Sequence, residues 1–224
     1  MTSSARNSPG SPTSHASPVS GRRAQIACGT TLLVGAGLLA WALRIRPGDP
    51  LFYPATMAMG LVWTGGALAA GWRIRFRRET VGHVVAGLVV GLGLLVLFLL
   101  GAGLVARIPL LAEPVDTLLA HARWGSLPAV LAITVINAVA EELFFRGALF
   151  DALGRHALVW STVAYTAVTL LSGVPLLAVA GLLLGLAAAL LRIRTRGIAA
   201  PITAHLTWTV GMLLLLPPAL ALWR

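Results

Sequence analysis

Two adjacent glutamates, Glu141 and Glu142, lie inside a strongly apolar stretch of the sequence. An acidic side chain near the centre of a bilayer costs about 3 kcal/mol on insertion scales, so such residues usually face the bundle interior and serve a function. Glu142 and Arg146 are four residues apart, which places them on one helix face where they can pair. Glu141 points about 100° away around the helix, on the same face as Asn137 one turn earlier. It is therefore available to act on a metal ion, a water molecule or a proton.

A single histidine, His205, lies in the last apolar stretch. With a rise of 1.5 Å per residue, Glu141 would lie about 12 Å and His205 about 10 Å from the same side of the membrane. A carboxylate and an imidazole at one depth can form a metal or proton-transfer site. The alternatives are purely structural: an ion pair between Glu142 and Arg146, and a buried histidine without a functional role. The ion pair accounts for one of the two adjacent glutamates better than it accounts for both.

The elements that must position these residues are membrane helices. The chain has 224 residues, of which 58% are hydrophobic and 11% charged, and its mean hydropathy is +0.87. Because a soluble domain has about 25% charged residues, this composition excludes a soluble enzyme and a disordered chain. We expect an all-α fold, a polytopic transmembrane bundle of about seven helices. The apolar runs are residues 24–43, 51–72, 81–106, 127–149, 157–173, 174–191 and 198–222.

Arginines between the apolar runs predict the orientation. All 17 basic residues are arginine, and the net charge is +10. With the N-terminus inside, most arginines lie in inner segments and the outer ones hold only Arg44, Arg46, Arg107, Arg123 and Arg224. This bias predicts that the N-terminus is inside and the C-terminus outside. The same distribution argues against nucleic-acid binding, because the arginines flank apolar runs and do not form one basic face.

Three further features of the sequence limit the domain organisation. Residues 1–21 are rich in Ser, Pro, Gly and Thr, and we interpret them as a disordered tail before an integral membrane domain at 22–224. The single cysteine, Cys28, excludes an internal disulfide framework. The spacings Gly87-x3-Gly91 and Gly181-x3-Gly185 predict close helix–helix approach.

The sequence Glu141-Glu142-x3-Arg146-Gly147, followed some sixty residues later by His205, resembles the type II CAAX endopeptidases. These are the CAAX-prenyl-protease and bacteriocin-processing family of intramembrane metalloproteases, sometimes grouped with abortive-infection proteins and called CPBP. The stretch Gly185–Ile198 also resembles the family's segment before its final histidine. The resemblance covers the core at 127–210.

The resemblance implies a catalytic set of Glu141, Glu142 and Arg146, with His205 binding a divalent metal, zinc, or the oxyanion. The family's second motif, Phe-x3-His, is degenerate, because the best register places Tyr165 at the aromatic position and Thr169 at the histidine. In the third motif Thr209 stands where the family has Asn or Asp. Since a zinc site usually needs three protein ligands, these changes leave the family's activity open.

The sequence therefore leads to the hypothesis of an intramembrane metal-dependent endopeptidase that acts on hydrophobic or membrane-associated peptides. The alternative is an inactive relative of the same fold that serves as a binding, immunity or scaffolding protein. A proton or solute pathway is weaker, because the sequence has no internal repeat. The expected location is a cell membrane, multi-pass, in the bacterial inner membrane. The substrate is not readable from the sequence.

Overall fold

The computed structural model describes residues 21–73 and 80–223, in which helices are joined by turns and short loops and no strand is present. The predicted tail at 1–21 lies outside the described residues apart from Gly21, and so do Arg224 and the arginines at 75, 77 and 78. The all-α fold is therefore confirmed, whereas the predicted orientation of the N-terminus stays a prediction.

Nine α-helices are found in the described part of the chain. They are α1 (Arg22–Ala42), α2 (Phe52–Ala69), α3 (Val81–Val105), α4 (Pro109–Trp124), α5 (Leu127–Glu142), α6 (Leu149–Leu153), α7 (Ala157–Leu170), α8 (Pro175–Thr195) and α9 (Ala199–Leu222). A π-helical turn, Leu143–Ala148, joins α5 to α6, and a 3-10 turn, Gly154–His156, joins α6 to α7. The seven helices predicted from apolar runs are all present, as α1, α2, α3, α5, α7, α8 and α9.

Proline and glycine set the helix ends. Prolines stand in the first turn of α4, α5 and α8, where the missing N–H costs no hydrogen bond. Gly154 has φ 54° and Gly173 has φ 82°, a backbone region that favours glycine. These two glycines allow the chain to reverse after α6 and after α7.

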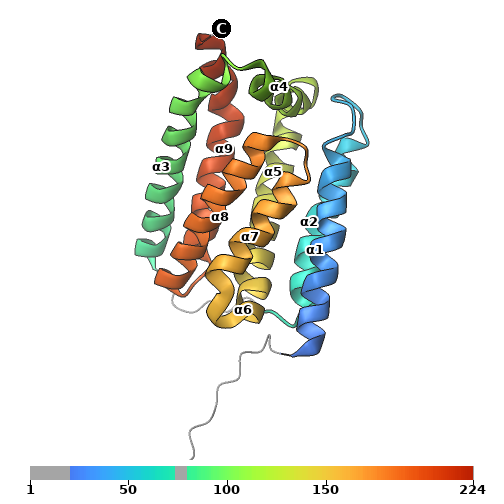
Figure 1. Cartoon of the computed structure of the whole chain (residues 1–224), viewed down its shortest axis with the longest axis vertical. Helices are drawn as coiled ribbons and strands as arrows, with labels where there is room; N and C mark the ends of the chain where they lie inside the picture. Colours follow the sequence, from blue (N-terminus) through green and yellow to red (C-terminus); the bar gives the residue numbers. More distant parts are fainter. Residues whose placement is uncertain (1–20, 74–79, 224) are drawn as a thin grey trace, which may run out of the picture.

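The helices stand side by side in a bundle, with α4 lying across one end and α6 at the other (Figure 1). α3 packs against α9, α7 against α8, and α1 against α2, while α2 and α9 both contact α5. The motif helix α5 is therefore held between the N-terminal pair and the C-terminal helix.

Within the described residues, five stretches are long and apolar enough to cross a membrane: 22–42, 81–105, 127–170, 175–195 and 199–222. The stretch 127–170 contains α5, α6 and α7, and the chain turns back at Gly154, so that α7 runs beside its neighbours towards the opposite end (Figure 1). The chain is a multi-pass membrane protein.

The amphipathic helix α4 was not among the predicted helices. It contains Glu113, Pro114 and Asp116, so it has no long apolar run of the kind that identifies a spanning helix. Buried His121 lies on another side of the helix, with Nε2 2.9 Å from the carbonyl oxygen of Ile45. The other buried positions, Ala112, Val115 and Leu119, have a spacing typical of one helix face. α4 covers the end of the bundle with that face.

The predicted single helix at 127–149 is also irregular in the structure. The regular α-helix ends at Glu142, and the π-helical turn Leu143–Ala148 follows. Phe144 and Phe145 in this turn are fully buried against Trp63 of α2, with ring centroids 5.2 Å and 5.0 Å from that indole. The turn that carries Arg146 is therefore packed into the centre of the largest core cluster.

Candidate active site

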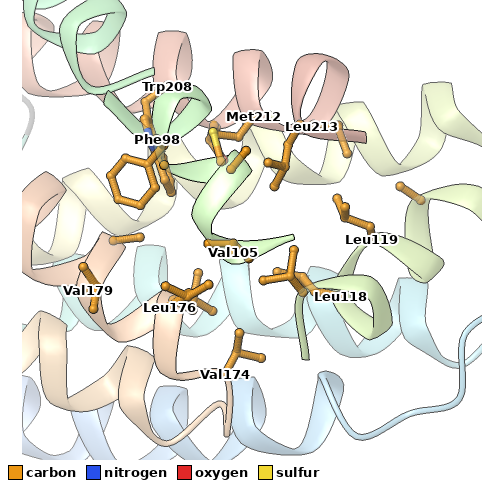
Figure 2. Close-up of a pocket in the computed structure, with 18 of the residues that line it drawn as sticks. Phe98, Val105, Leu118, Leu119, Val174, Leu176, Val179, Trp208, Met212 and Leu213 are labelled. Atoms are coloured by element: carbon orange, nitrogen blue, oxygen red, sulfur yellow. The ribbon is translucent and has the colours of Figure 1, made fainter. Parts of the chain in front are cut away.

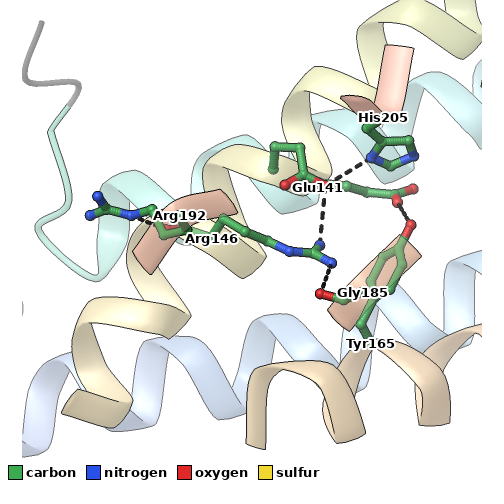
Figure 3. A network of polar contacts seen from close by, with 7 residues as sticks. Glu141, Arg146, Tyr165, Gly185, Arg192 and His205 are labelled. Carbon is green, nitrogen blue, oxygen red and sulfur yellow. Dashed lines mark hydrogen bonds and ion pairs between the residues drawn. The ribbon is translucent and has the colours of Figure 1, made fainter. Parts of the chain in front are cut away.

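The candidate site is built where α5 passes into the π-helical turn. Glu141 and Glu142 are the last residues of α5, and Arg146 lies in the turn. α7 contributes Tyr165 and α9 contributes His205, so three segments far apart in the sequence meet here (Figure 3). The predicted residues Glu141, Glu142, Arg146 and His205 are thus brought into one cluster.

A buried ion pair forms the base of the cluster. Nη1 of Arg146 lies 3.1 Å from Oε1 of Glu142, and the exposed fractions of the two side chains are 1% for Arg146 and 0% for Glu142. Arg146 also donates through Nη2 to the backbone carbonyl of Gly185 in α8, at 3.2 Å. The i, i+4 pairing expected from the spacing is therefore present. Because removal of one partner would leave the other charge buried and unpaired, the pair acts as a unit.

His205 contacts the same carboxylate. Its Nδ1 lies 2.8 Å from Oε1 of Glu142. An ionised carboxylate only accepts hydrogen bonds, so we assign the proton to Nδ1 as donor, which leaves Nε2 for other interactions. The sequence predicted a carboxylate and an imidazole at matching depth, and the structure shows that the direct contact is to Glu142.

Glu141 has a different partner, the hydroxyl of Tyr165, which donates to Oε2 at 2.7 Å. The Tyr165 ring also lies under the guanidinium of Arg146, with 4.5 Å from the arginine Cζ to the ring centroid. Tyr165 therefore touches both the glutamate that is free of the ion pair and the arginine within it. Sequence reasoning placed Tyr165 only at the aromatic position of the second motif and gave no sign that its hydroxyl reaches Glu141.

A small pocket of about 180 Å³, here called the site pocket, joins Glu141 and His205. Its other polar side chains are Asn137 and three threonines, and it is completed by apolar groups. The lining residues are Phe52, Thr56, Met59, Val130, Ile133, Thr134, Asn137, Ala138, Glu141, His205 and Thr209. A carboxylate and an imidazole thus line one small pocket within the bundle.

Asn137 ties the wall of this pocket to a second helix. Its Nδ2 donates to the carbonyl of Thr56 in α2 at 3.1 Å and to the carbonyl of Ile133 in its own helix at 3.0 Å. Oδ1 lies against Gly60, where a Cβ atom would come within 3.2 Å of it. Asn137 thereby fixes the distance between α2 and the turn of α5 that carries Glu141.

Thr169, at the position where the second motif has histidine, uses its hydroxyl inside α7. It donates to the carbonyl of Tyr165 at 3.1 Å and of Thr166 at 2.9 Å. Its side chain packs against Gly181 of α8, where a Cβ atom would collide with it. Thr169 thus serves the close approach of α7 and α8, and Gly181 and Gly185 both lie at close helix contacts, as their spacing predicted.

A resident zinc ion does not fit the residues present. Among the described residues, no group of three or more His, Cys, Asp or Glu is arranged to hold a metal. Oε1 of Glu142 is already engaged by Arg146 and by His205. Glu141 and His205 alone are fewer than the three protein ligands of a typical catalytic zinc site.

The arrangement of Glu141 and His205 can perform acid–base chemistry on a polar bond. A carboxylate such as Glu141 can accept a proton from water, and its hydrogen bond to Tyr165 fixes its orientation. His205, held at Nδ1 by Glu142, can present Nε2 to the same space, which is the logic of a base oriented by a carboxylate. Both groups are positioned by other side chains before a ligand binds.

A larger cavity, here called the apolar cavity, adjoins the site pocket. It has a volume of about 560 Å³ and lies between α3, α4, α5, α8 and α9 (Figure 2). Labelled lining residues such as Phe98, Leu118, Leu176 and Met212 point into it. Phe52, Val130, Thr134 and Thr209 line both spaces, so the two are in contact. An apolar group in the larger cavity would reach towards Glu141 and His205.

Comparison with known protein families gives a match for part of the chain. Residues 123–211 match the family model described as "Type II CAAX prenyl endopeptidase Rce1-like". The matched segment runs from the end of α4 into α9 and contains Glu141, Glu142, Arg146, Tyr165 and His205. No curated protein and no solved structure matches the chain.

Proposed function

We propose that this protein is an intramembrane endopeptidase, because its residues 123–211 match the family model of Rce1-like type II CAAX prenyl endopeptidases. The observation that carries the proposal is the meeting of Glu141 and His205 at one pocket inside the bundle. A membrane enzyme that cleaves peptide bonds needs a base and an electrophilic group in a space that a peptide can enter.

In the proposed reaction Glu141 is the general base. Its carboxylate takes a proton from a water molecule while the water oxygen attacks the carbonyl carbon of the scissile bond. The carbonyl electron pair moves onto oxygen, and a donor aimed at that oxygen stabilises the charge. When the C–N bond breaks, the proton held by Glu141 passes to the leaving amine, and two peptide ends result.

His205 is the proposed partner of the oxyanion. In its imidazolium form Nε2–H can donate to the carbonyl oxygen, while Nδ1–H stays on Glu142 at 2.8 Å. Glu142 and Arg146 act through His205 and are positioning residues in this scheme. Tyr165 holds the Glu141 carboxylate through the 2.7 Å hydrogen bond.

The proposed substrate is a hydrophobic or membrane-associated peptide. The apolar cavity supports this choice, since it adjoins the site pocket and is lined almost entirely by aliphatic and aromatic side chains. A charged group placed there would lose its hydration without gaining a partner. We place the protein in a cell membrane, specifically a bacterial inner membrane, because its arginine-only, Ala-, Leu- and Gly-rich sequence is typical of a bacterium with a GC-rich genome.

The sequence-based expectation of a divalent metal bound by His205 stays a prediction, and no step above depends on it. Metal analysis of the purified protein tests it. A stoichiometric ion that is lost in His205→Ala would support the metal hypothesis, and its absence would favour the reaction of Glu141 and water alone.

The function is tested with purified protein in liposomes and a panel of quenched fluorescent hydrophobic peptides, with and without a C-terminal prenyl group. We expect cleavage by the wild type and a loss of about 10²–10⁴-fold in Glu141→Gln, the range that general-base catalysis contributes. Glu113→Gln, on the exposed face of α4, is the matched control. Equal rates for the wild type and Glu141→Gln would contradict the proposal.

The second candidate is an inactive relative that binds a peptide or a partner helix. Thr169 and Thr209 favour it, because they stand at two positions where the resemblance implies other polar residues. It predicts that the same peptides bind to the wild type and to Glu141→Gln with equal affinity and are cleaved by neither.

A further inference from the structure

Arg192, near the C-terminal end of α8, reaches the motif turn from outside the catalytic cluster. Its Nε donates to the backbone carbonyl of Arg146 at 2.9 Å. Its Nη2 lies 3.1 Å from Oδ1 of Asp151 in α6. The sequence indicated only that the arginines between apolar runs set the orientation in the membrane, so this contact assigns Arg192 a second role.

α8 therefore holds Arg146 at both ends (Figure 3). The guanidinium of Arg146 donates to the carbonyl of Gly185, while the backbone carbonyl of Arg146 accepts from Arg192. Gly185 and Arg192 are seven residues apart, which places them on one face of the helix. One helix face thus fixes the side chain and the backbone of the same residue.

The backbone contact falls on the irregular part of the chain. Arg146 lies in the π-helical turn Leu143–Ala148, where the N–H of Leu149 bonds to the carbonyl of Phe144, five residues back. π-turns interrupt the regular hydrogen-bond ladder and occur frequently at functional sites. A donor from another helix at this point favours the π-helical register over the regular α-helical one.

The guanidinium of Arg192 suits this task because it is a planar fork. One side of the fork meets Asp151 and the other meets the carbonyl, so a single side chain bridges α6 and the π-turn. Arg192 and Asp151 are 18% and 25% exposed, and an ion pair with this much solvent contact adds little stability on its own. The effect of the ion pair is to direct the Nε donor of Arg192 towards the carbonyl of Arg146.

We propose that Arg192 is a positioning residue of the active site, which holds the π-turn in the register that directs Arg146 and Glu142 towards His205. This proposal rests on the proposed peptidase function. A change of register by one residue would turn Arg146 about 100° around the helix axis and remove it from Glu142.

The test compares Arg192→Gln and Arg192→Lys with Arg194→Gln, an exposed arginine two residues away on the same helix. We expect Arg192→Gln to lower kcat by about tenfold with KM changed less than about twofold, because misplaced catalytic groups slow the reaction of bound substrate. Arg192→Lys should recover part of the rate, since lysine offers a charge without the fork, and Arg194→Gln should match the wild type. An Arg192→Gln enzyme with wild-type kcat would overturn the proposal.

A second measurement does not need activity. Amide hydrogen exchange in the full-length protein should speed up in residues 143–151 for Arg192→Gln and stay unchanged for Arg194→Gln. Equal exchange in both variants would overturn the positioning role even if the protein is not a peptidase. Faster exchange together with an inactive wild type would separate failure of the proposed function from failure of this inference.

Discussion

At the scale of single residues, the site depends on two adjacent carboxylates that have different partners. Glu142 is committed to Arg146 and His205, whereas Glu141 is bound through one oxygen to Tyr165 and lines the site pocket. The rotation of about 100° between neighbouring residues of a helix explains this difference, because it directs the two side chains to different partners. The spacing alone predicted the ion pair and the availability of Glu141.

Tyr165→Phe tests the orientation of Glu141. The variant keeps the ring beneath Arg146 but removes the hydroxyl that donates to Glu141. We expect kcat to fall by about tenfold with the fold intact, since a freely rotating carboxylate is less often in reactive geometry. Tyr53→Phe removes the hydroxyl of the other tyrosine, which accepts from the backbone N–H of Ser126 and does not contact Glu141, and it is the control in the same cleavage assay. Equal kcat values for the two variants would contradict the orienting role.

Glu142→Gln tests the buried ion pair. The variant leaves the guanidinium of Arg146 buried without a charged partner, which costs about 3–5 kcal/mol in the free energy of unfolding. Thermal unfolding in detergent should show a marked drop in Tm, and the double variant Glu142→Gln/Arg146→Met should recover much of it. A double variant that is no more stable than Glu142→Gln would show that the pair does not act as a unit.

At the scale of elements, close helix contacts bring the cluster together. α3 packs against α9 at Gly87 and Gly91, where an added Cβ would lie against the backbone of Ala200 and Ala204. Ala204 precedes His205, so the position of the histidine depends on how near α3 can come. The glycine spacing predicted this close approach, although not which helix would be the partner.

Gly91→Ala tests that dependence. Its Cβ would lie 2.6 Å from the carbonyl oxygen of Ala204, so α3 and α9 must separate. We expect a loss of about 1–3 kcal/mol in unfolding free energy, as for other overpacked sites. Gly93→Ala is a matched control on the same helix, because nothing lies within 4 Å of an added Cβ there. The prediction fails if the two variants unfold at the same temperature.

The sequence predicted the seven apolar helices well and two local features poorly. Runs of about 20 apolar residues identify spanning helices, because a helix of that length crosses the hydrocarbon core of a bilayer. This criterion misses α4, because α4 contains Glu113 and Asp116 and has no long apolar run. The same criterion does not detect the π-turn at Leu143–Ala148, because this turn depends on tertiary contacts such as that of Arg192 and not on local composition.

At the scale of the whole molecule, the two spaces define a direction for the substrate. The apolar cavity extends to α4, at one end of the bundle, while α6, which Arg192 contacts through Asp151, lies at the other. Glu141 and His205 stand between these ends at the site pocket. An apolar group of the substrate would therefore point towards the α4 end.

The predicted topology puts the α4 end outside. In a Cys28→Ser background, Ser126→Cys, in the exposed link before α5, should react with a membrane-impermeant maleimide on intact cells. Arg155→Cys, exposed at the turn beside α6, should react only after the membrane is permeabilised. The physical reason is the excess of arginines in the segments on the α6 side. The reverse labelling pattern would show that the N-terminus is outside.

The proposed reaction requires that Glu141 activates water to cleave a peptide bond inside the bundle. This requirement is tested by mass spectrometry of the peptide products formed in heavy-oxygen water. We expect the wild type to incorporate one heavy oxygen into the new carboxyl end at a defined bond, and Glu141→Gln to form almost none of this product. Formation of the same labelled product at the same rate by Glu141→Gln would contradict it.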